Sequence, residues 1–271
     1  MTGYSVALVD SGTMLRRNLR RMRRYPSLTL FIAGIPVVLL LLFVYVFGAT
    51  LGAGLGAGPG ARLGQLPGSR AAYIAYVVPG ILVITVAGAA QGTAISVAMD
   101  MTAGMIARFK TMDIARVSVL TGHLIGSVIQ TMLALLIVMA VAVVIGFRPS
   151  TGPLAWAAAL GVLALAAVAV SWLSVALGMV SGSVETASNL PMFLILLPFL
   201  SSGFVPTSSM PGVLGWFAQY QPFTPLIETL RGLLQGSPIG SSGIVAVGWC
   251  LAISIGGYLW ARRLYIRNPA A

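Results

Sequence analysis

The sequence predicts an all-α integral membrane protein with six transmembrane helices. Of its 271 residues, 58% are hydrophobic and only 8% are charged, whereas soluble domains carry about 25% charged residues. The apolar residues gather in runs long enough to cross a bilayer, and all 16 Lys and Arg lie outside these runs. A water-soluble fold of this size could not cover its surface with so few charged residues, so the chain must be surrounded by lipid.

Six apolar runs approach the length of about 20 residues that a transmembrane helix needs. They cover residues 27–48, 77–98, 119–146, 154–180, 189–205 and 243–261. Pro26 suits a helix start and Pro36 is expected to kink the first helix. The fifth run is the shortest and holds Pro191 and Pro198, so a broken or tilted helix is expected there. The first run is too long for the apolar core of a cleaved signal peptide.

The basic residues predict the orientation through the positive-inside rule. Six helices with the N-terminus inside place most of the basic residues in cytoplasmic segments: Arg16, Arg17, Arg20, Arg21, Arg23, Arg24, Arg108, Lys110, Arg116, Arg262, Arg263 and Arg267. The outer segments then hold Arg62, Arg70, Arg148 and Arg231. Both termini are therefore expected in the cytoplasm, with the chain in the plasma membrane.

The segment before the first run predicts an amphipathic helix at the cytoplasmic interface. Apolar residues recur there at helical spacing, and arginines fill the remaining positions: Arg16, Arg17, Arg20, Arg21, Arg23 and Arg24. The alternative is a plain basic flank of the first transmembrane helix.

Residues 99–118 lie between the second and third runs and predict a short helix that docks on a partner. Asp100 is a candidate N-cap. An adaptable apolar face follows at i, i+4, i+8 and i+11, made of Met101, Met105, Phe109 and Met112. The alternative is a helix that rests on its own membrane surface.

The outer segment 206–242 is too apolar for a free loop and too rich in proline for a transmembrane helix. Short helices that dip into the outer leaflet, with aromatic side chains at headgroup depth, fit it. The outer segment 49–72 is Gly-rich and predicts a linker.

No residue pattern predicts catalysis, a cofactor or a metal. The five acidic residues lie outside the middle of the predicted helices, and the one histidine, His123, has too few partners for a zinc site or a triad. The one cysteine, Cys250, is interpreted as a buried apolar residue. A phosphate-binding loop is absent, and mid-membrane ionisable groups that would couple transport to ions are absent too. Any energy that drives the protein must therefore come from outside the chain, which points to an ATPase partner acting on a cytoplasmic surface.

Two segments resemble the ABC-2 type permeases, most closely their daunorubicin-resistance (DrrB-like) branch. The first is similar to the cytoplasmic segment that couples these permeases to the ATPase; its residues are Asp100, Met101, Gly104, Met105, Arg108, Phe109, Met112 and Arg116. The second resembles the re-entrant extracytoplasmic hairpin between helices five and six; its residues are Phe204, Pro206, Pro211, Gln221, Pro222, Pro225, Glu228 and Arg231.

The resemblance implies the permease subunit of an ATP-binding cassette exporter, which is not itself an enzyme. Such a transporter contains two permeases, identical or related, and two ATPase subunits, and ATP and Mg²⁺ bind to the ATPase. Members of the family export drugs, lipids, lipid-linked glycans or peptides, and the apolar helices here favour a hydrophobic or amphipathic compound such as an antibiotic or a lipid.

Three other functions fit less well. A channel would need a polar pore lining, and the apolar runs offer only scattered polar residues such as Gln91 and Gln130. A membrane-embedded enzyme of lipid metabolism would need paired acids or a metal site. The net charge of +11 could indicate nucleic acid binding, but the basic residues flank apolar runs instead of forming a patch.

Overall fold

The structure is a computed structural model that describes residues 26–47, 70–102 and 116–267. These residues form helices joined by short turns, and no strand occurs among them. The prediction of an all-α fold is confirmed. Four helices are long and apolar enough to cross a membrane: α4 (Arg70–Thr102), α6 (Arg116–Val144), α7 (Pro153–Val180) and α12 (Ser242–Arg267).

The first and fifth predicted spans correspond to shorter apolar helices. The first consists of α2 (Pro26–Leu42) and the π-helical turn η1 (Phe43–Phe47). The fifth consists of α8 (Val184–Asn189), α9 (Met192–Leu196) and the 3₁₀ turn η2 (Leu197–Leu200). Ser183 caps α8 by accepting a hydrogen bond from the Thr186 N–H at 3.2 Å. The helix then breaks at Leu190 and Pro191, because proline has no N–H to continue it.

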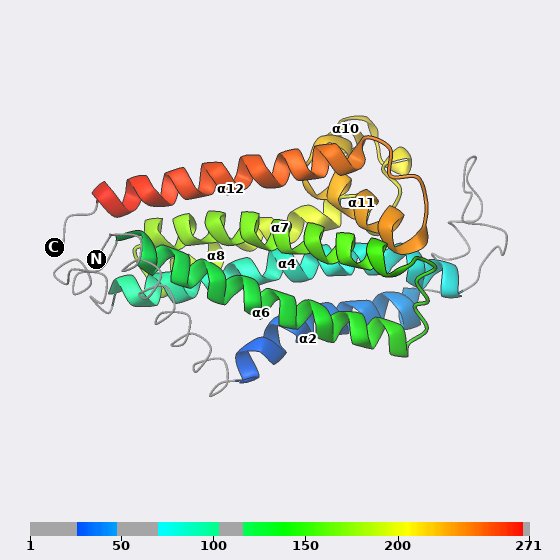
Figure 1. The fold of residues 1–271 in the computed structure, drawn as a ribbon, viewed down its shortest axis with the longest axis horizontal. Helices are drawn as coiled ribbons and strands as arrows, with labels where there is room; N and C mark the ends of the chain where they lie inside the picture. Colours follow the sequence, from blue (N-terminus) through cyan, green and yellow to red (C-terminus); the bar gives the residue numbers. More distant parts are fainter. Residues whose placement is uncertain (1–25, 48–69, 103–115, 268–271) are drawn as a thin grey trace.

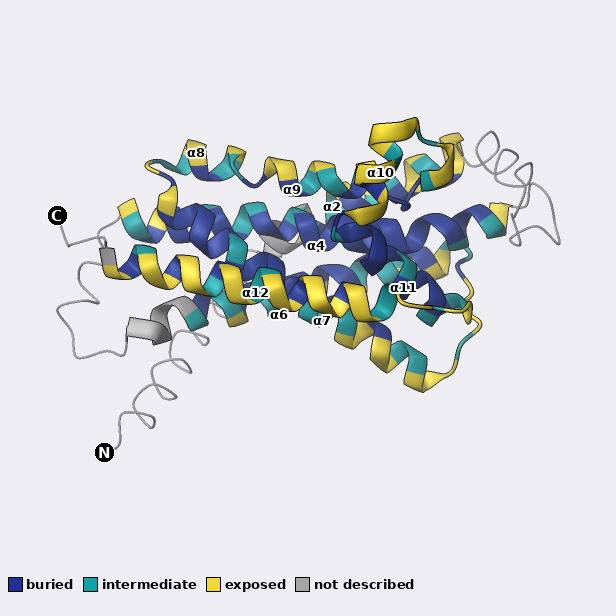
Figure 2. Cartoon of the chain, turned by 90° about the horizontal axis from the view of Figure 1, so that it is seen from above, coloured by how far each residue is buried: buried dark blue, intermediate teal, exposed yellow. Residues whose placement is uncertain are grey.

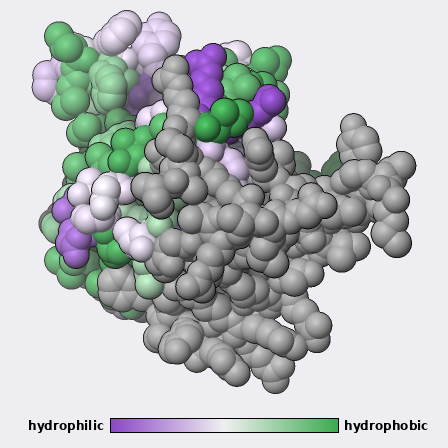
Figure 3. Space-filling model, turned by 90° about the vertical axis from the view of Figure 1, so that its left-hand side faces the viewer, coloured by the Kyte–Doolittle hydropathy of each residue, from purple (hydrophilic) through white to green (hydrophobic). Residues whose placement is uncertain are grey.

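The long helices lie side by side between two ends of an elongated bundle, with α4, α7 and α12 running in one direction and α6 in the other (Figure 1). The α11 end contains the start of α4 and α12, the end of α6 and the short helices α10 (Gly212–Tyr220) and α11 (Phe223–Gln235). The Asp100 end contains the end of α4 and α12 and the start of α6 and α8. Figure 3 looks onto the Asp100 end, where the described surface carries both hydrophilic and hydrophobic residues.

Helix α4 forms the centre of the bundle, and its middle is almost entirely buried (Figure 2). It packs against α2, α6, α7, α8 and α11. Glycines permit the closest approaches: a Cβ on Gly178 of α7 would lie 2.6 Å from the Ala94 carbonyl oxygen of α4. Such small residues bring membrane helices together where no hydrophobic force acts between them. By contrast, α12 exposes a long apolar face that suits contact with lipid.

Helix α4 is longer than its apolar run predicts, at both of its ends. It begins at Arg70 instead of near residue 77, and Pro79 lies inside it. It ends at Thr102, so Asp100 lies in its last turn and the interpretation of Asp100 as an N-cap is wrong. The hydropathy of the sequence shows where the apolar run ends, but the hydrogen-bonded helix continues beyond the run at both ends.

Candidate functional site

At the α11 end, two consecutive short helices differ sharply in burial. Helix α11 is buried along most of its length, whereas α10 exposes Val213, Trp216 and Tyr220. Gly236 ends α11 with a φ of +72°, the left-handed conformation that favours glycine, and its N–H donates to the Gly232 carbonyl at 2.8 Å. Helix α11 thus brings polar side chains into the bundle, as a re-entrant segment would need to.

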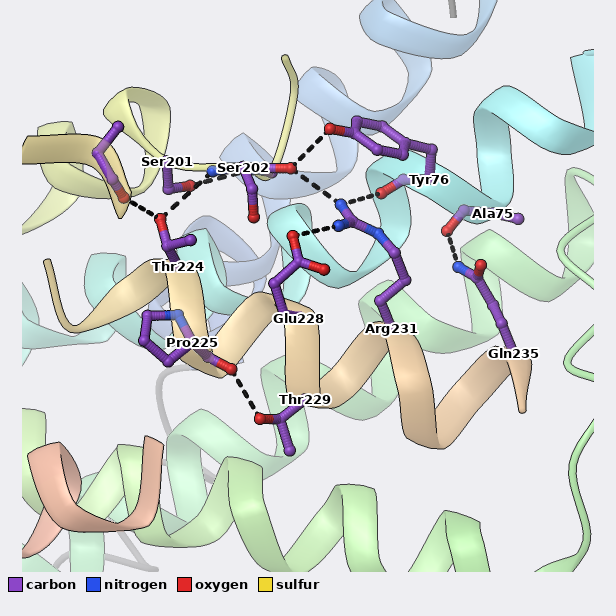
Figure 4. A network of polar contacts seen from close by, with 12 residues as sticks. Ala75, Tyr76, Ser201, Ser202, Thr224, Pro225, Glu228, Thr229, Arg231 and Gln235 are labelled. Carbon is purple, nitrogen blue, oxygen red and sulfur yellow. Dashed lines mark hydrogen bonds and ion pairs between the residues drawn. The ribbon is translucent and has the colours of Figure 1, made fainter. Parts of the chain in front are cut away.

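Arg231 joins α11 to two other parts of the fold (Figure 4). Its Nη1 donates to Glu228 Oε1 at 2.6 Å, and its Nη2 donates to the backbone carbonyls of Ser202 at 2.9 Å and Tyr76 at 3.3 Å. The guanidinium also lies 4.1 Å from the centre of the Tyr76 ring. The Tyr76 hydroxyl donates to the same Ser202 carbonyl at 2.9 Å. One arginine therefore ties α11, α4 and the turn after η2 together.

A second bond from α11 to α4 follows from the proline inside α4. Pro79 has no N–H, so the carbonyl of Ala75, four residues earlier, loses its helical partner. The Gln235 side chain supplies one, because its Nε2 donates to the Ala75 oxygen at 2.5 Å. The next carbonyl, that of Tyr76, accepts from Arg231. Side chains of α11 thus complete the hydrogen bonding of α4 at its proline.

The turn that follows η2 is held by Thr224 of α11 and by Gln221, which lies two residues before that helix. Gln221 Nε2 donates to the carbonyls of Leu197 at 3.0 Å and Leu200 at 2.8 Å. Thr224 Oγ1 accepts a hydrogen bond from the Ser202 N–H at 3.4 Å. Gly203 then lies directly against α4: a Cβ on Gly80 would be 2.9 Å from the Gly203 Cα atom. The broken fifth segment, α11 and α4 therefore meet at one place.

The structure brings most of the hairpin residues predicted from the sequence together, but not all of them. Phe204 stacks on Phe43 at 4.5 Å and on Phe199 at 5.3 Å between ring centres. Pro225 lies in the buried first turn of α11, where its carbonyl accepts from Thr229 at 2.7 Å. Pro222 precedes α11 and is partly exposed, and Pro206 and Pro211 lie in the turns before α10, away from the network.

The site residues predicted from the sequence leave out Tyr76, Ser202, Thr224 and Gln235, which all belong to this network. Tyr76 precedes the predicted start of its helix, and Ser202 contributes backbone atoms that no side-chain pattern marks. Pro79 was the available signal, because a proline inside a buried helix implies that another group bonds the freed carbonyl.

The Asp100 end carries a second polar contact, between α4 and α6. His123 Nε2 lies 3.0 Å from Asp100 Oδ2, and both side chains are buried. Met101 packs beside them against a small apolar cluster of α4, α7 and α12. Arg116 begins α6, but its side chain lies outside the description.

The other predicted coupling and interfacial residues fall outside the described residues. These are Gly104, Met105, Arg108, Phe109, Met112, Arg16, Arg17, Arg20, Arg21, Arg23 and Arg24.

The polar contacts at the α11 end and at the Asp100 end hold helices together. Hydrogen bonds to backbone carbonyls and a salt bridge can form and break as helices move, but they supply no nucleophile. Within residues 26–47, 70–102 and 116–267, no three His, Cys, Asp or Glu side chains gather in a way that could hold a metal ion.

Comparison with known proteins agrees with the resemblance seen in the sequence. The family model described as "ABC-2 type transporter" matches residues 11–234. The daunorubicin resistance ABC transporter permease protein DrrB1 of Streptomyces coeruleorubidus is 28% identical over 245 residues, which cover 90% of this chain and 80% of that protein. A Mycobacterium tuberculosis protein named "Probable doxorubicin resistance ABC transporter permease protein DrrC" is 24% identical over 162 residues, covering 60% of this chain and 59% of that protein.

Proposed function

This chain belongs to the ABC-2 type transporter family, and we propose that it is the permease subunit of an exporter whose cargo is a hydrophobic or amphipathic compound. It is a multi-pass membrane protein of a transport system, and its named relatives are permeases. The proposal adds the direction of transport, the cargo, the partners and the residues that link ATP hydrolysis to movement.

One observation carries the mechanism: α4 runs without interruption from the polar network of the α11 end to the buried pair of the Asp100 end. The 24 residue steps from Tyr76 to Asp100 span about 36 Å at 1.5 Å per residue, close to the ~30 Å hydrocarbon thickness of a bilayer. In the proposal, an ATPase acts on the Asp100 end, and α4 carries the movement to the α11 end, where α11 acts as the gate.

The proposed arrangement places the Asp100 end in the cytoplasm and the α11 end outside, in the plasma membrane. Six crossings with both termini inside follow from the positive-inside rule, with α2 and the α8–η2 segment as the first and fifth crossings. The α10–α11 hairpin then re-enters the membrane from outside. Two ATPase subunits and a second permease, identical or related, complete the transporter.

The proposed cargo class rests on the relatives and on the chemistry of the helices. The relatives carry daunorubicin and doxorubicin resistance in their names. The exposed faces of α2, α6 and α12 are apolar, which suits a cargo that enters from lipid. A lipid substrate has the same requirement.

The first test is purification of the tagged chain from native membranes in mild detergent. We expect an ATPase at a ratio near one to one, with hydrolysis that vanadate inhibits. A second permease band would indicate a heterodimer. A chain that purifies alone, even after chemical crosslinking, would contradict the proposed coupling and favour a channel or a membrane enzyme.

The second test separates the two cargo classes. Inside-out vesicles that contain the complex are given ATP with either daunorubicin or a fluorescent phospholipid, and accumulation is followed by fluorescence. The control is the complex with the phosphate-loop lysine of the ATPase replaced. Replacement of Arg108 or Phe109 should lower accumulation while ATP hydrolysis continues; unchanged accumulation would contradict their coupling role.

A further inference from the structure

The Asp100–His123 contact lies where α4 ends and α6 begins, so it holds the end of α4 to the start of α6. Nε2 and Oδ2 are 3.0 Å apart, and the side chains of His123 and Asp100 are only 9% and 7% exposed. A carboxylate taken out of water is costly unless a donor or positive charge faces it. The contact therefore opposes any change in the separation of these two helix ends.

The surroundings of the pair set this end apart from the rest of the bundle. The main core continues from α2 through the α11 end, whereas a separate apolar cluster contains Val97, Val175 and Tyr265 with Met101 and Leu124 packed on it. These residues come from α4, α6, α7 and α12. The Asp100 end therefore has an apolar cluster of its own, to which α4, α6, α7 and α12 contribute.

A second polar contact joins the same two helices deeper in the bundle and provides a comparison. The hydroxyl of Thr93 on α4 is hydrogen bonded to that of Ser127 on α6, which also lies 3.0 Å from the hydroxyl of Ser171 on α7. These groups are neutral, and Thr93 and Thr131 also bond carbonyls of their own helices. They fix helix packing, but they do not lie at the end on which an ATPase would act.

We propose that Asp100 and His123 are a positioning pair, which keeps the ends of α4 and α6 at a fixed separation so that force applied at the Asp100 end moves α4 as a rigid body. The inference rests on the proposed permease function and assigns Asp100 a role different from direct contact with the ATPase. Without the pair, the end of α6 would yield while α4 stayed in place. ATP would then be hydrolysed without movement of the gate.

The test uses the purified complex with its ATPase in lipid nanodiscs, in a Cys250→Ala background. An environment-sensitive dye on Val213→Cys reports the far end of the molecule, since Val213 is 86% exposed on α10. Three quantities are measured: co-purification of the ATPase, the rate of ATP hydrolysis, and the change in dye emission on trapping with ATP and vanadate. The variants are Asp100→Asn, which is nearly isosteric, His123→Gln, and the exchange Asp100→His with His123→Asp. Thr93→Val is the matched control.

We expect Asp100→Asn and His123→Gln to bind the ATPase and hydrolyse ATP, with a dye response at least about fivefold smaller than in the parent, which is the scale of an ordinary coupling energy. The exchanged pair should recover most of the response, and Thr93→Val should keep it.

An undiminished response in both single variants would overturn the inference and leave the permease function standing. Equal loss in Thr93→Val, or loss of the folded complex in every Asp100 and His123 variant, would make the pair an ordinary packing contact and overturn it as well. A parent chain with no ATPase partner would overturn the proposed function itself.

Discussion

The two ends of α4 are held in different ways. At the α11 end, its backbone carbonyls at Ala75 and Tyr76 accept hydrogen bonds from side chains of another helix, Gln235 and Arg231. At the Asp100 end, one of its own side chains pairs with a side chain of α6. Contacts at the α11 end are spread over several weak bonds around a proline, so they can be exchanged one at a time. The Asp100 end instead carries a buried side-chain pair that joins α4 to α6. The contacts at the α11 end suit a gate that opens, and the pair at the Asp100 end suits the transmission of force.

The largest expected effect comes from removing the glycine contact that lets the α11 end assemble. A Cβ on Gly80 would lie 2.9 Å from the Cα atom and 3.0 Å from the carbonyl oxygen of Gly203, so backbone must move. We expect Gly80→Ala to lower the free energy of unfolding by about 3 kcal/mol, the upper part of the range for overpacking, as measured by SDS titration in mild detergent. Gly88→Ala is the control, because Gly88 has open space around it. Equal stability of the two variants would show that the Gly80 contact is not tight.

Next in size is Arg231→Met, which keeps a long side chain but removes the charge and every hydrogen bond. Two carbonyl bonds, the Glu228 contact and the Tyr76 ring contact are lost. The Glu228 side chain is 38% exposed, so water screens that ion pair and it contributes little. We expect about 2 kcal/mol less stability from the carbonyl bonds and near-complete loss of daunorubicin accumulation. Arg231→Lys should restore charge but not transport; full transport by the lysine variant would contradict the geometric role of the guanidinium.

A smaller effect tests whether Gln235 compensates for Pro79. Gln235→Met should cost about 1–2 kcal/mol, because it leaves the Ala75 carbonyl without its donor in a buried place. In a Pro79→Ala background the backbone N–H returns, and the same change at Gln235 should cost less. The double-mutant cycle measures the difference directly. Additive costs would mean that the two residues act independently.

The smallest effect distinguishes two buried tyrosines on one helix. Tyr76→Phe loses the bond to the Ser202 carbonyl and should cost about 1 kcal/mol. The Tyr73 hydroxyl has no hydrogen-bond partner among the described residues, so Tyr73→Phe should be neutral or stabilising. Thermal unfolding of the two purified variants gives the comparison, and a reversed order would place the bonding elsewhere in the network.

The sequence predicts the features that depend on apolar residues, such as the positions of the long helices. It does not predict the contacts that depend on hydrogen bonds to backbone carbonyls. The long helices α4, α6, α7 and α12 follow from runs that must lie in lipid, and Arg231 and Glu228 follow from a motif. Tyr76 and Gln235 could not be predicted, because their partners are carbonyls, which every residue carries. Asp100 was expected to begin a helix since its side chain caps well, but the buried imidazole of His123 faces it in space, 23 positions away along the chain.

The length of α4 also makes the protein sensitive to the lipid around it. Its 33 residues extend about 50 Å, well beyond a hydrocarbon layer about 30 Å thick. A thinner bilayer is accommodated by tilting of long helices, and tilt moves the two ends of a rigid rod in opposite directions. A change in acyl-chain length would therefore move both Tyr76 and Asp100. Bilayer thickness would in this way alter the coupling between ATP hydrolysis and movement of the gate.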